Sequence, residues 1–397
     1  MKCNIWNDCA KSPLTELLSF IVDNRGKTVP TASNGHKLIA TNCVTNNTLF
    51  PVYEKIRYLS DETYNTWFRA HPIPGDILFV NKGTPGRVCM VPDPVDFCIA
   101  QDMIALRADE TKIYNKYLFA VLRSREIQQL IYNTSVGDVI PHFKKQFLNK
   151  LLIPVPDWSI QKKIGDFYYL LSYKIECNNK INENLQQQAQ AIYENMFTGF
   201  RTSQVELSNI IDVRDGTHNS PKAENEGYPL ITSKHLLPFS VDRASANRIS
   251  KDDFEKINER SLVETQDILM SMIGTIGLIS YVSYPVVDFA IKNVALFKTS
   301  HSPEFAYYIL CYLKSNATKQ YIEKHLAGST QKYISLRELR KMPVYQPSNT
   351  ELEKFNFLVN PMFEDIVLRV NENIYLSEIR NTLLPKLMNG EIDVDGI

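Results

Sequence analysis

The 397-residue sequence contains no apolar run that approaches the ~20 residues needed for a membrane-spanning helix. Its first residues also lack the apolar stretch of a secretory signal, which favours a cytoplasmic protein. Cysteine is scarce and odd in number, at seven, and no two cysteines stand at Cys-x-x-Cys spacing, so neither a disulfide framework nor a zinc site is expected. The remaining composition is ordinary for a globular chain of two or three domains.

An excess of charge of either sign is also absent, because 44 Lys and Arg residues balance 44 Asp and Glu residues. Zero net charge removes the simplest argument for nucleic-acid binding. It does not exclude binding, because a local basic patch matters more than the total charge.

The sequence contains an internal duplication. A shift of 191 residues aligns the first half with the second, with matches in the same order across most of both halves. Asp76-Ile-Leu aligns with Asp267-Ile-Leu, and the following Gly83-Thr-Pro-Gly aligns with Gly274-Thr-Ile-Gly. A period this long indicates two copies of a whole domain, each with an appended segment, rather than a solenoid of short repeats.

Each copy begins with a mixed globule of about 150 residues. Short apolar runs bounded by Gly and Pro, such as 76–80 and 267–271, predict strands, and runs such as 116–124 predict short helices. The Asp-Ile-Leu strands of the two copies each precede a Gly-Thr-x-Gly turn. The globules are therefore expected to share one fold.

A long helix is predicted after each globule, at residues 160–197 and at about 350–388. Apolar residues recur there on one stripe, and such a stripe needs a partner surface, for which the other helix is the nearest equivalent. Asn178 falls on this stripe, either as a chance polar residue or as one that fixes the helix register. Pro361 and Pro385 are expected to kink the second helix or to make it shorter than the first.

Most catalytic motifs are missing. There is no P-loop, no Gly-x-Gly-x-x-Gly, no Asn/Asp-Pro-Pro-aromatic methyltransferase motif and no His-Glu-x-x-His, so no catalytic residue and no metal site is predicted. One weak alternative exists, since Asp93 with Glu110 and Lys112 fits the loose pattern of a metal-dependent nuclease. The second copy does not repeat it, because His301 and Pro303 occupy the matching positions.

Several sequence runs together point to one family. They are Leu383-Leu-Pro-Lys-Leu-Met-Asn-Gly-Glu-Ile392, Asp215-Gly-Thr-His with Pro221, Gly-Ser-Thr-Gln-Lys-Tyr-Ile-Ser at 328–335, and the Asp-Ile-Leu strand before each Gly-Thr-x-Gly turn. With the duplication, they make nearly the whole chain resemble the specificity (S) subunit of type I restriction–modification systems. The first copy departs from the second at 137–144 and at 24–28, as expected if the two copies recognise different half-sites.

The resemblance implies an α+β fold, with two homologous mixed α/β target-recognition domains. Each domain would be followed by a long α-helix, and the two helices would pack antiparallel as a coiled coil. The implied boundaries are target-recognition domain 1 at 1–157, a central spacer helix at 158–200, target-recognition domain 2 at 201–348, and a C-terminal helix and tail at 349–397.

The resemblance also implies a non-catalytic subunit that binds a bipartite, asymmetric site in double-stranded DNA. Two methylation subunits and the restriction subunits would be its partners in a type I restriction enzyme and adenine DNA methyltransferase complex. S-adenosylmethionine, ATP and Mg would belong to those partners, and no cofactor is implied for this chain.

Cations and polar residues gather in the predicted loops, several beside equivalent Gly-containing turns. Such turns let backbone N–H groups approach a phosphate, and adjacent Lys or Arg can contact phosphates or guanine edges. A merely solvated surface is the alternative interpretation of these cations. The predicted DNA-binding residues are Arg25, Lys27, Lys82, Thr84, Arg87, His142 and Lys144 in the first copy, and His218, Lys222, Lys234, His235, Thr275, Lys332 and Tyr333 in the second.

Two other functions remain open at this point. One is the specificity part of a related methylation–cleavage system whose catalytic chain is a fusion. The other is a coiled-coil adaptor that binds proteins and no DNA, which the zero net charge slightly favours.

Overall fold

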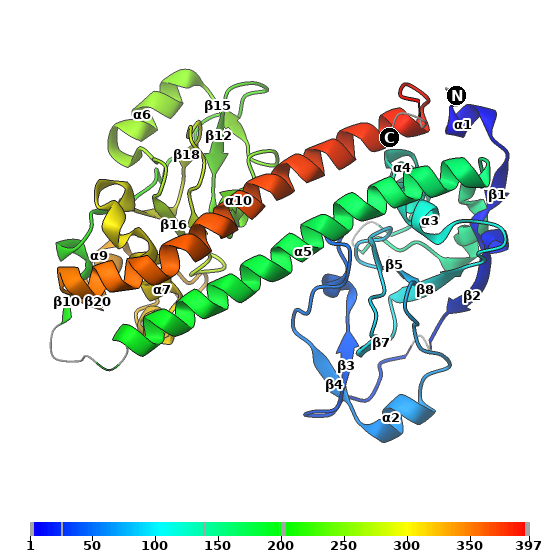
Figure 1. The fold of residues 1–397 in the computed structure, drawn as a ribbon, viewed down its shortest axis with the longest axis horizontal. Coiled ribbons are helices and arrows are strands. Elements are labelled where there is room, and N and C mark those ends of the chain that lie inside the picture. The colour runs from blue at the N-terminus through cyan, green and yellow to red at the C-terminus, as the bar shows by residue number, and fades with distance from the viewer. Residues whose placement is uncertain (1–3, 25–26, 138–139, 198, 200–203, 394–397) are drawn as a thin grey trace. The chain divides into compact units, whose positions relative to one another are not determined.

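The computed structural model describes residues 4–24, 27–137, 140–197, 199 and 204–393 (Figure 1). The chain forms two compact units, of which unit 1 comprises residues 1–178 and 373–397 and unit 2 comprises residues 179–372. The long helices α5 (Trp158–Phe197) and α10 (Asn349–Met388) each contribute one segment to unit 1 and one segment to unit 2.

Unit 1 contains a four-stranded antiparallel sheet in the order β2-β8-β5-β6 and a three-stranded sheet in the order β4-β3-β7, in which β3 and β7 are parallel. A third pairing joins β1 to β9. The strands are β1 (Lys11–Pro13), β2 (Leu18–Val22), β3 (His36–Ile39), β4 (Arg57–Leu59), β5 (Ile77–Val80), β6 (Val88–Met90), β7 (Phe97–Ile99), β8 (Met103–Ala108) and β9 (Leu152–Pro154). The shorter helices are α1 (Ile5–Asp8), α2 (Asp61–Thr66), α3 (Asn115–Leu122) and α4 (Arg125–Thr134).

Strand β5 is apolar at every position because both of its faces are covered. Ile77 and Phe79 pack in one cluster with the buried residues of α3. Leu78 and Val80 point to the opposite face and pack in a second cluster with Ile39 of β3. The short apolar run seen in the sequence is therefore a central strand of the core.

Unit 2 repeats this arrangement with the sheet orders β11-β19-β16-β17 and β15-β12-β18 and with the pairing of β10 and β20. A small extra pairing joins β13 and β14. The strands are β10 (Gln204–Glu206), β11 (Val213–Asp215), β12 (Tyr228–Ile231), β13 (Leu236–Leu237), β14 (Ser240–Val241), β15 (Arg248–Ile249), β16 (Ile268–Ser271), β17 (Ile279–Tyr281), β18 (Ala290–Ile291), β19 (Val294–Phe297) and β20 (Pro343–Tyr345). The shorter helices are α6 (Lys251–Ser261), α7 (Ala306–Lys314), α8 (Asn316–Lys324) and α9 (Leu336–Arg340).

An ion pair explains the buried Asp that precedes the central strand in each copy. In unit 1, Arg107 donates to both carboxylate oxygens of Asp76, at 2.9 and 3.0 Å. In unit 2, Lys298 Nζ lies 2.6 Å from Asp267 Oδ2, and Lys298 stands 191 residues after Arg107. Both pairs tie the start of the central strand to its neighbour, with a different cation in each copy.

In each unit, a segment of α5 packs antiparallel on a segment of α10. In unit 1, Arg380 Nη1 donates to Ser172 Oγ at 3.2 Å and Asn178 Nδ2 donates to Asn373 Oδ1 at 2.8 Å, so residue numbers rise along one helix as they fall along the other. The predicted antiparallel packing is confirmed. Asn178 is fully buried, and the hydrogen bond of its side-chain amide across the apolar seam supports a role in fixing the register of the two helices.

The two long helices have equal lengths of 40 residues, and their bounds differ by the same 191 residues. Of the two expected effects of the prolines, a kink or a shorter helix, the shorter second helix is therefore wrong. A proline removes one main-chain donor, but continuous burial of Phe355, Val359 and Phe363 on the inner face of α10 outweighs that loss. Among the described helices, none is both long and apolar enough to cross a membrane.

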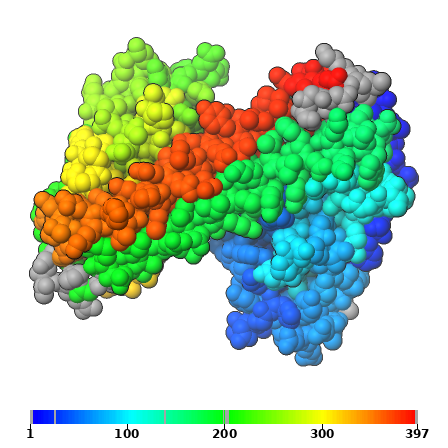
Figure 2. Space-filling model, in the orientation of Figure 1, coloured from blue at the N-terminus to red at the C-terminus, as the bar shows by residue number. Residues whose placement is uncertain are grey.

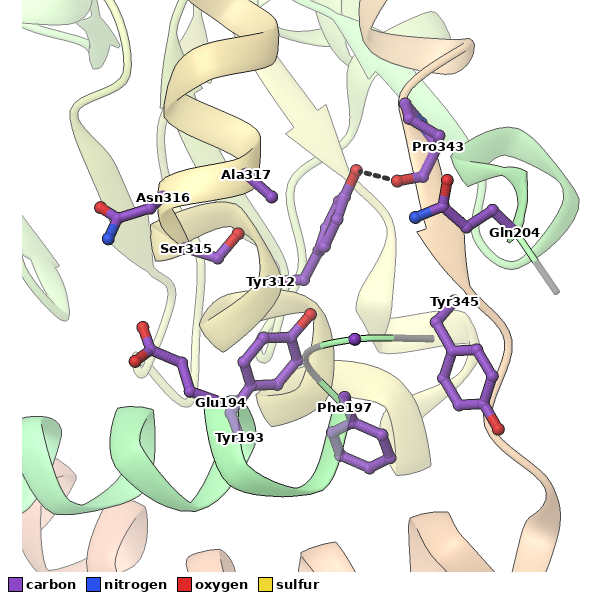
Figure 3. A pocket seen from close by; sticks show the side chains of 11 residues that line it. Tyr193, Glu194, Phe197, Gln204, Tyr312, Ser315, Asn316, Ala317, Pro343 and Tyr345 are labelled. Carbon is purple, nitrogen blue, oxygen red and sulfur yellow. Dashed lines mark hydrogen bonds between the residues drawn. The ribbon is translucent and has the colours of Figure 1, made fainter. Parts of the chain in front are cut away.

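Aromatic rings join the end of α5 to the globule of unit 2. The ring of Phe197 lies 5.0 Å from that of Tyr308 and 5.4 Å from that of Phe355, and Tyr193 packs in the same group. Beside them is a cavity of about 380 Å³, at whose wall the Tyr312 hydroxyl donates to Pro343 O at 3.0 Å (Figure 3). None of the predicted DNA-binding residues is among the described residues that line this cavity.

Candidate nucleic-acid interface

In unit 1, the turn between β5 and β6 packs against the segment that follows α4. Lys82 and His142 form a β-bridge, Phe143 N–H donates to Asn81 O at 2.8 Å, and Gly83 N–H donates to Pro141 O at 2.9 Å. Five predicted residues are thereby brought to two adjacent segments. They are Lys82, Thr84, Arg87, His142 and Lys144.

Unit 2 contains the same pairing of segments. Ile273 forms a β-bridge with Tyr333, and Ile334 N–H donates to Met272 O at 3.0 Å, in the positions that match the first copy at an offset of 191. Thr275, Lys332 and Tyr333 are therefore brought together, and Tyr333 occupies the place of His142. In both copies, the Gly-Thr-x-Gly turn and the segment after α4 or α8 therefore lie side by side.

The backbone conformation of the turn explains why the Gly-Thr-x-Gly motif needs its two glycines. Gly83 and Gly86 both have positive φ, at 87° and 89°, and so do Gly274 and Gly277, at 78° and 83°. Residues with a side chain rarely adopt this conformation, so the spacing of the two glycines specifies the turn. The turn holds Thr84 and Thr275 at equivalent positions between the glycines.

The cations of this surface are available to bind an anion. Lys82, Lys144 and Lys332 are exposed, and neither they nor Arg87 have an ion-pair partner within the described part of the chain. Lys145 differs, because its ammonium is paired with Asp23. The N–H groups of Gly83 and Gly86 already donate to carbonyls of unit 1, so the exposed cations are the groups of this surface that fit a phosphate.

A second polar cluster of unit 2 surrounds the loop after β11. The ring of His218 bridges Asp215 Oδ2 at 3.0 Å and Asn293 Oδ1 at 2.7 Å, yet its side chain remains 63% exposed. Arg260 of α6 donates to Asp215 Oδ1 at 2.6 Å. The loop and α6 border a cavity of about 390 Å³, which holds His218 at its edge.

Two cations that line this cavity and a third that bonds to one of its lining residues were missed by the sequence analysis. Lys256 and Arg260 project from α6 and line the cavity, and Lys292 Nζ donates to Ser220 Oγ of the loop at 2.5 Å. Asp253 is a carboxylate on the same lining. The 191-residue offset could have indicated Arg260, because it aligns with Arg69 of the first copy.

In unit 1, the matching loop is arranged around an uncharged residue. Asn24, which aligns with Asp215, accepts a hydrogen bond from Arg69 N–H at 2.9 Å and donates to Ile99 O at 2.9 Å. The side chain of Arg69 is exposed, as is Lys27, which aligns with His218. Arg25 lies outside the described residues.

The remaining predicted residues of unit 2 divide into exposed and buried ones. Lys222 and Lys234 are exposed. His235 is buried, and its Nδ1 accepts a hydrogen bond from Thr232 N–H at 2.9 Å to cap a helical turn. Burial lowers the pKa of His235, which favours the neutral ring. His235 is therefore not a member of the proposed contact surface.

Neither a metal centre nor the nuclease pattern has structural support in the described residues. No group of three or more His, Cys, Asp or Glu side chains in that part of the chain could hold a metal ion. Lys112, the lysine of the nuclease pattern, is ion-paired with Asp109 at 3.0 Å and also donates to Glu16 O at 3.1 Å.

Comparison with known proteins gives the same domain twice. Residues 16–187 and again residues 203–354 match the type I restriction modification DNA specificity domain. The chain belongs to this family. The two matched regions cover most of the chain and confirm the predicted duplication, the predicted family and the predicted two-domain α+β fold class.

Similar proteins of this family come from distant organisms. The chain is 24% identical over 349 residues to the type I restriction enzyme MjaIX specificity subunit of Methanocaldococcus jannaschii, with 81% of this chain and 78% of that one covered. It is 24% identical over 401 residues to the HindI specificity subunit of Haemophilus influenzae, with 80% and 86% covered. The crystal structure of the type I restriction-modification S subunit from M. genitalium shares the fold, with a TM-score of 0.55, 16% identity and 96% of each chain covered.

Proposed function

We propose that this chain is the sequence-specificity subunit of a type I restriction–modification complex and that it recognises a bipartite, asymmetric DNA site. Residues 1–157 and 201–348 would be the two target-recognition domains, and the long helices the spacer. One observation carries the proposal: both units join the same pair of loops through a matching β-bridge and a matching backbone hydrogen bond, and present different side chains on them. A shared frame with different side chains suits recognition of two different half-sites.

The proposed contacts fall into two chemical groups. Phosphates would be bound by the cations and would set the position of the DNA, whereas bases would be distinguished by polar side chains on the same loops. The phosphate group comprises Lys27, Lys82, Arg87, Lys144, Lys222, Lys234 and Lys332, with Arg69, Lys256 and Lys292 added from the structure and Arg25 from the sequence alone. The base group comprises Thr84, His142, Thr275 and Tyr333, and His218 would join it by exchanging one of its hydrogen bonds to Asp215 or Asn293 for one to a base.

Partner subunits would supply the chemistry. We propose that two methylation subunits bring S-adenosylmethionine, that restriction subunits bring ATP and Mg, and that this chain contributes no catalytic residue. Uncovered apolar side chains on the long helices support such binding, since large exposed apolar surfaces mark interaction sites. These helices lie uncovered on the face seen in Figure 2, and their exposed apolar residues are Trp158, Leu170, Tyr173, Tyr375 and Ile379 in unit 1 and Ile181, Phe357, Leu358 and Leu368 in unit 2. The same proposal puts the complex in the cytoplasm.

The test is a gel shift of this chain, with and without its methylation subunit, on a DNA library that is sequenced after binding. We expect weak binding by the chain alone and tight binding by the complex, with two short conserved words separated by a fixed, unspecified gap. Binding of the complex to protein partners without any selected DNA word would instead favour a coiled-coil adaptor. Selection of the same words by a fused catalytic chain would favour the related methylation–cleavage system.

A double substitution tests the phosphate contacts at the cavity beside α6. In Lys256→Gln with Lys292→Gln, we expect the slope of log affinity against log salt to fall by about 1 for each contact removed, with all DNA sequences affected alike. The measurement is a salt titration of the complex on specific and non-specific DNA. Lys251→Gln is the matched control, because Lys251 lies on the same helix and pairs with Glu255 at 3.5 Å. An equal change in both variants would contradict these contacts.

A further inference from the structure

The segment after α4 and the segment after α8 form twin turns. Val136 N–H donates to His142 O at 3.0 Å and His142 N–H donates to Val136 O at 2.8 Å. In unit 2, Ala327 and Tyr333 exchange the same two hydrogen bonds, each at 2.9 Å. Both turns therefore begin and end at equivalent positions of the repeat, 191 residues apart.

A glycine fixes the backbone of each turn in the same way. Gly137 has φ of 101° and Gly328 has φ of 90°. A Cβ atom would lie 2.7 Å from Ile140 O at Gly137 and 2.2 Å from Gln331 O at Gly328, so no other residue fits without movement of the backbone. The carbonyl that faces the glycine belongs to Ile140 in the first turn and to Gln331 in the second. These two residues therefore occupy the same place in their turns.

These twin residues have opposite chemistry. Ile140 is 54% exposed, although a side chain of its size gains stability only when buried. Gln331 is also exposed and carries an amide that both donates and accepts. Next to Ile140, the Pro141 carbonyl accepts the hydrogen bond from Gly83 N–H, so the turn is held against the Gly-Thr-x-Gly loop and its exposed Lys82.

We propose that Ile140 recognises a thymine in the first half-site by contact with its 5-methyl group, while Gln331 recognises its base by hydrogen bonds. This inference rests on the proposed DNA-binding function. An isoleucine has no donor for a phosphate, and among base edges in the major groove the thymine methyl is the apolar feature. Lys82 and Lys144 flank the turn and would hold the phosphates while Ile140 meets the base.

The experiment compares thymine with uracil, which lacks the 5-methyl group. Duplexes are made with deoxyuridine in place of thymidine in one half-site at a time, and affinity for the assembled complex is measured. For the unaltered chain, we expect about fourfold weaker binding when the half-site of residues 1–157 carries uracil, the effect of one buried methyl-sized group. In Ile140→Ala, the thymine and uracil duplexes should bind equally.

A matched variant and a second measurement keep the test specific. Gln331→Ala should weaken recognition of the other half-site and leave the thymine-to-uracil ratio of the first unchanged. Binding to non-specific DNA at low salt should be the same in all three proteins, which checks that the exposed substitutions leave the fold intact. A ratio unchanged by Ile140→Ala, or a first half-site without thymine on either strand, would overturn the assignment of Ile140. If the complex of the unaltered chain recognised no bipartite DNA site at all, that result would instead overturn the proposed function.

Discussion

Exchange of residues 1–157 for the matching domain of another specificity subunit is expected to change one half of the recognised DNA site and to leave the other half unchanged. The reason is that the proposed contacts of this half, from Lys27 to Lys144, all lie in unit 1, and each unit has its own buried core. Each mismatched base pair costs about 1–3 kcal/mol, so several mismatches lower the affinity for the original half-site by several powers of ten.

The measurement for this exchange is the map of modified adenines in a genome that carries the chimaera with its methylation subunit. Exchange of residues 201–348 is the matched control and should change the other word. The gap should stay constant in both chimaeras, because the helices α5 and α10 are retained. If one exchange altered both words, the two domains would not act independently and the proposed function would need revision.

Loss of the buried ion pair in unit 2 should give the largest effect on stability. Asp267 and Lys298 are 0% and 1% exposed, and Asp267 also accepts hydrogen bonds from Glu264 N–H at 2.7 Å and Ser300 N–H at 3.1 Å. In Asp267→Asn, the amide cannot satisfy all of these donors, and Lys298 keeps only its half-exposed partner Glu264, at 2.6 Å, in place of two carboxylates. We expect a decrease of about 3–5 kcal/mol in the free energy of unfolding.

This stability prediction is measured by urea unfolding followed by circular dichroism. Asp288→Asn is the control, because it removes an exposed ion pair with Arg243 in the same unit and should cost less than about 1 kcal/mol. An equal decrease in the free energy of unfolding of the two variants would show that burial of the Asp267–Lys298 pair contributes no extra stability.

The hydrogen bond from Lys298 also lowers the pKa of Glu264 below its usual 4.5. The stabilisation from Glu264 is therefore present above pH 4.5 and disappears as the pH falls through the lowered, folded-state pKa.

Duplication made much of the fold predictable from the sequence. The Asp-Ile-Leu runs indicated central strands, and these are β5 and β16 with all four residues buried. The Gly-Thr-x-Gly spacing indicated turns, and both glycines of each motif have positive φ. These features depend on local backbone preference and on apolar pattern, which short stretches of sequence contain. The continuous helix α10 was predicted less well, since the local effect of Pro361 and Pro385 was weaker than the burial of its inner face.

The candidate site was predictable only in part. Lys82 and His142 were chosen separately from loop composition, yet the β-bridge between them joins segments 60 residues apart, which no local pattern shows. His235 was chosen for its position in a basic loop, but tertiary packing buries its ring. Arg260 and Lys292 were missed because their relation to His218 exists only when α6 and the loop after β18 fold against the loop after β11.

The sequence by itself determined that this protein is a duplicated α+β chain with two long helices and that it belongs to the specificity family, because repeats, turn glycines and apolar periodicity are contained in the order of the residues and need no knowledge of tertiary contacts. Only the tertiary structure decided which loops form a common surface, which cations remain unpaired on it, and that Ile140 and Gln331 occupy the same place in twin turns. Those properties depend on burial and on hydrogen bonds between distant segments, and they arise only when the sheets close around their cores.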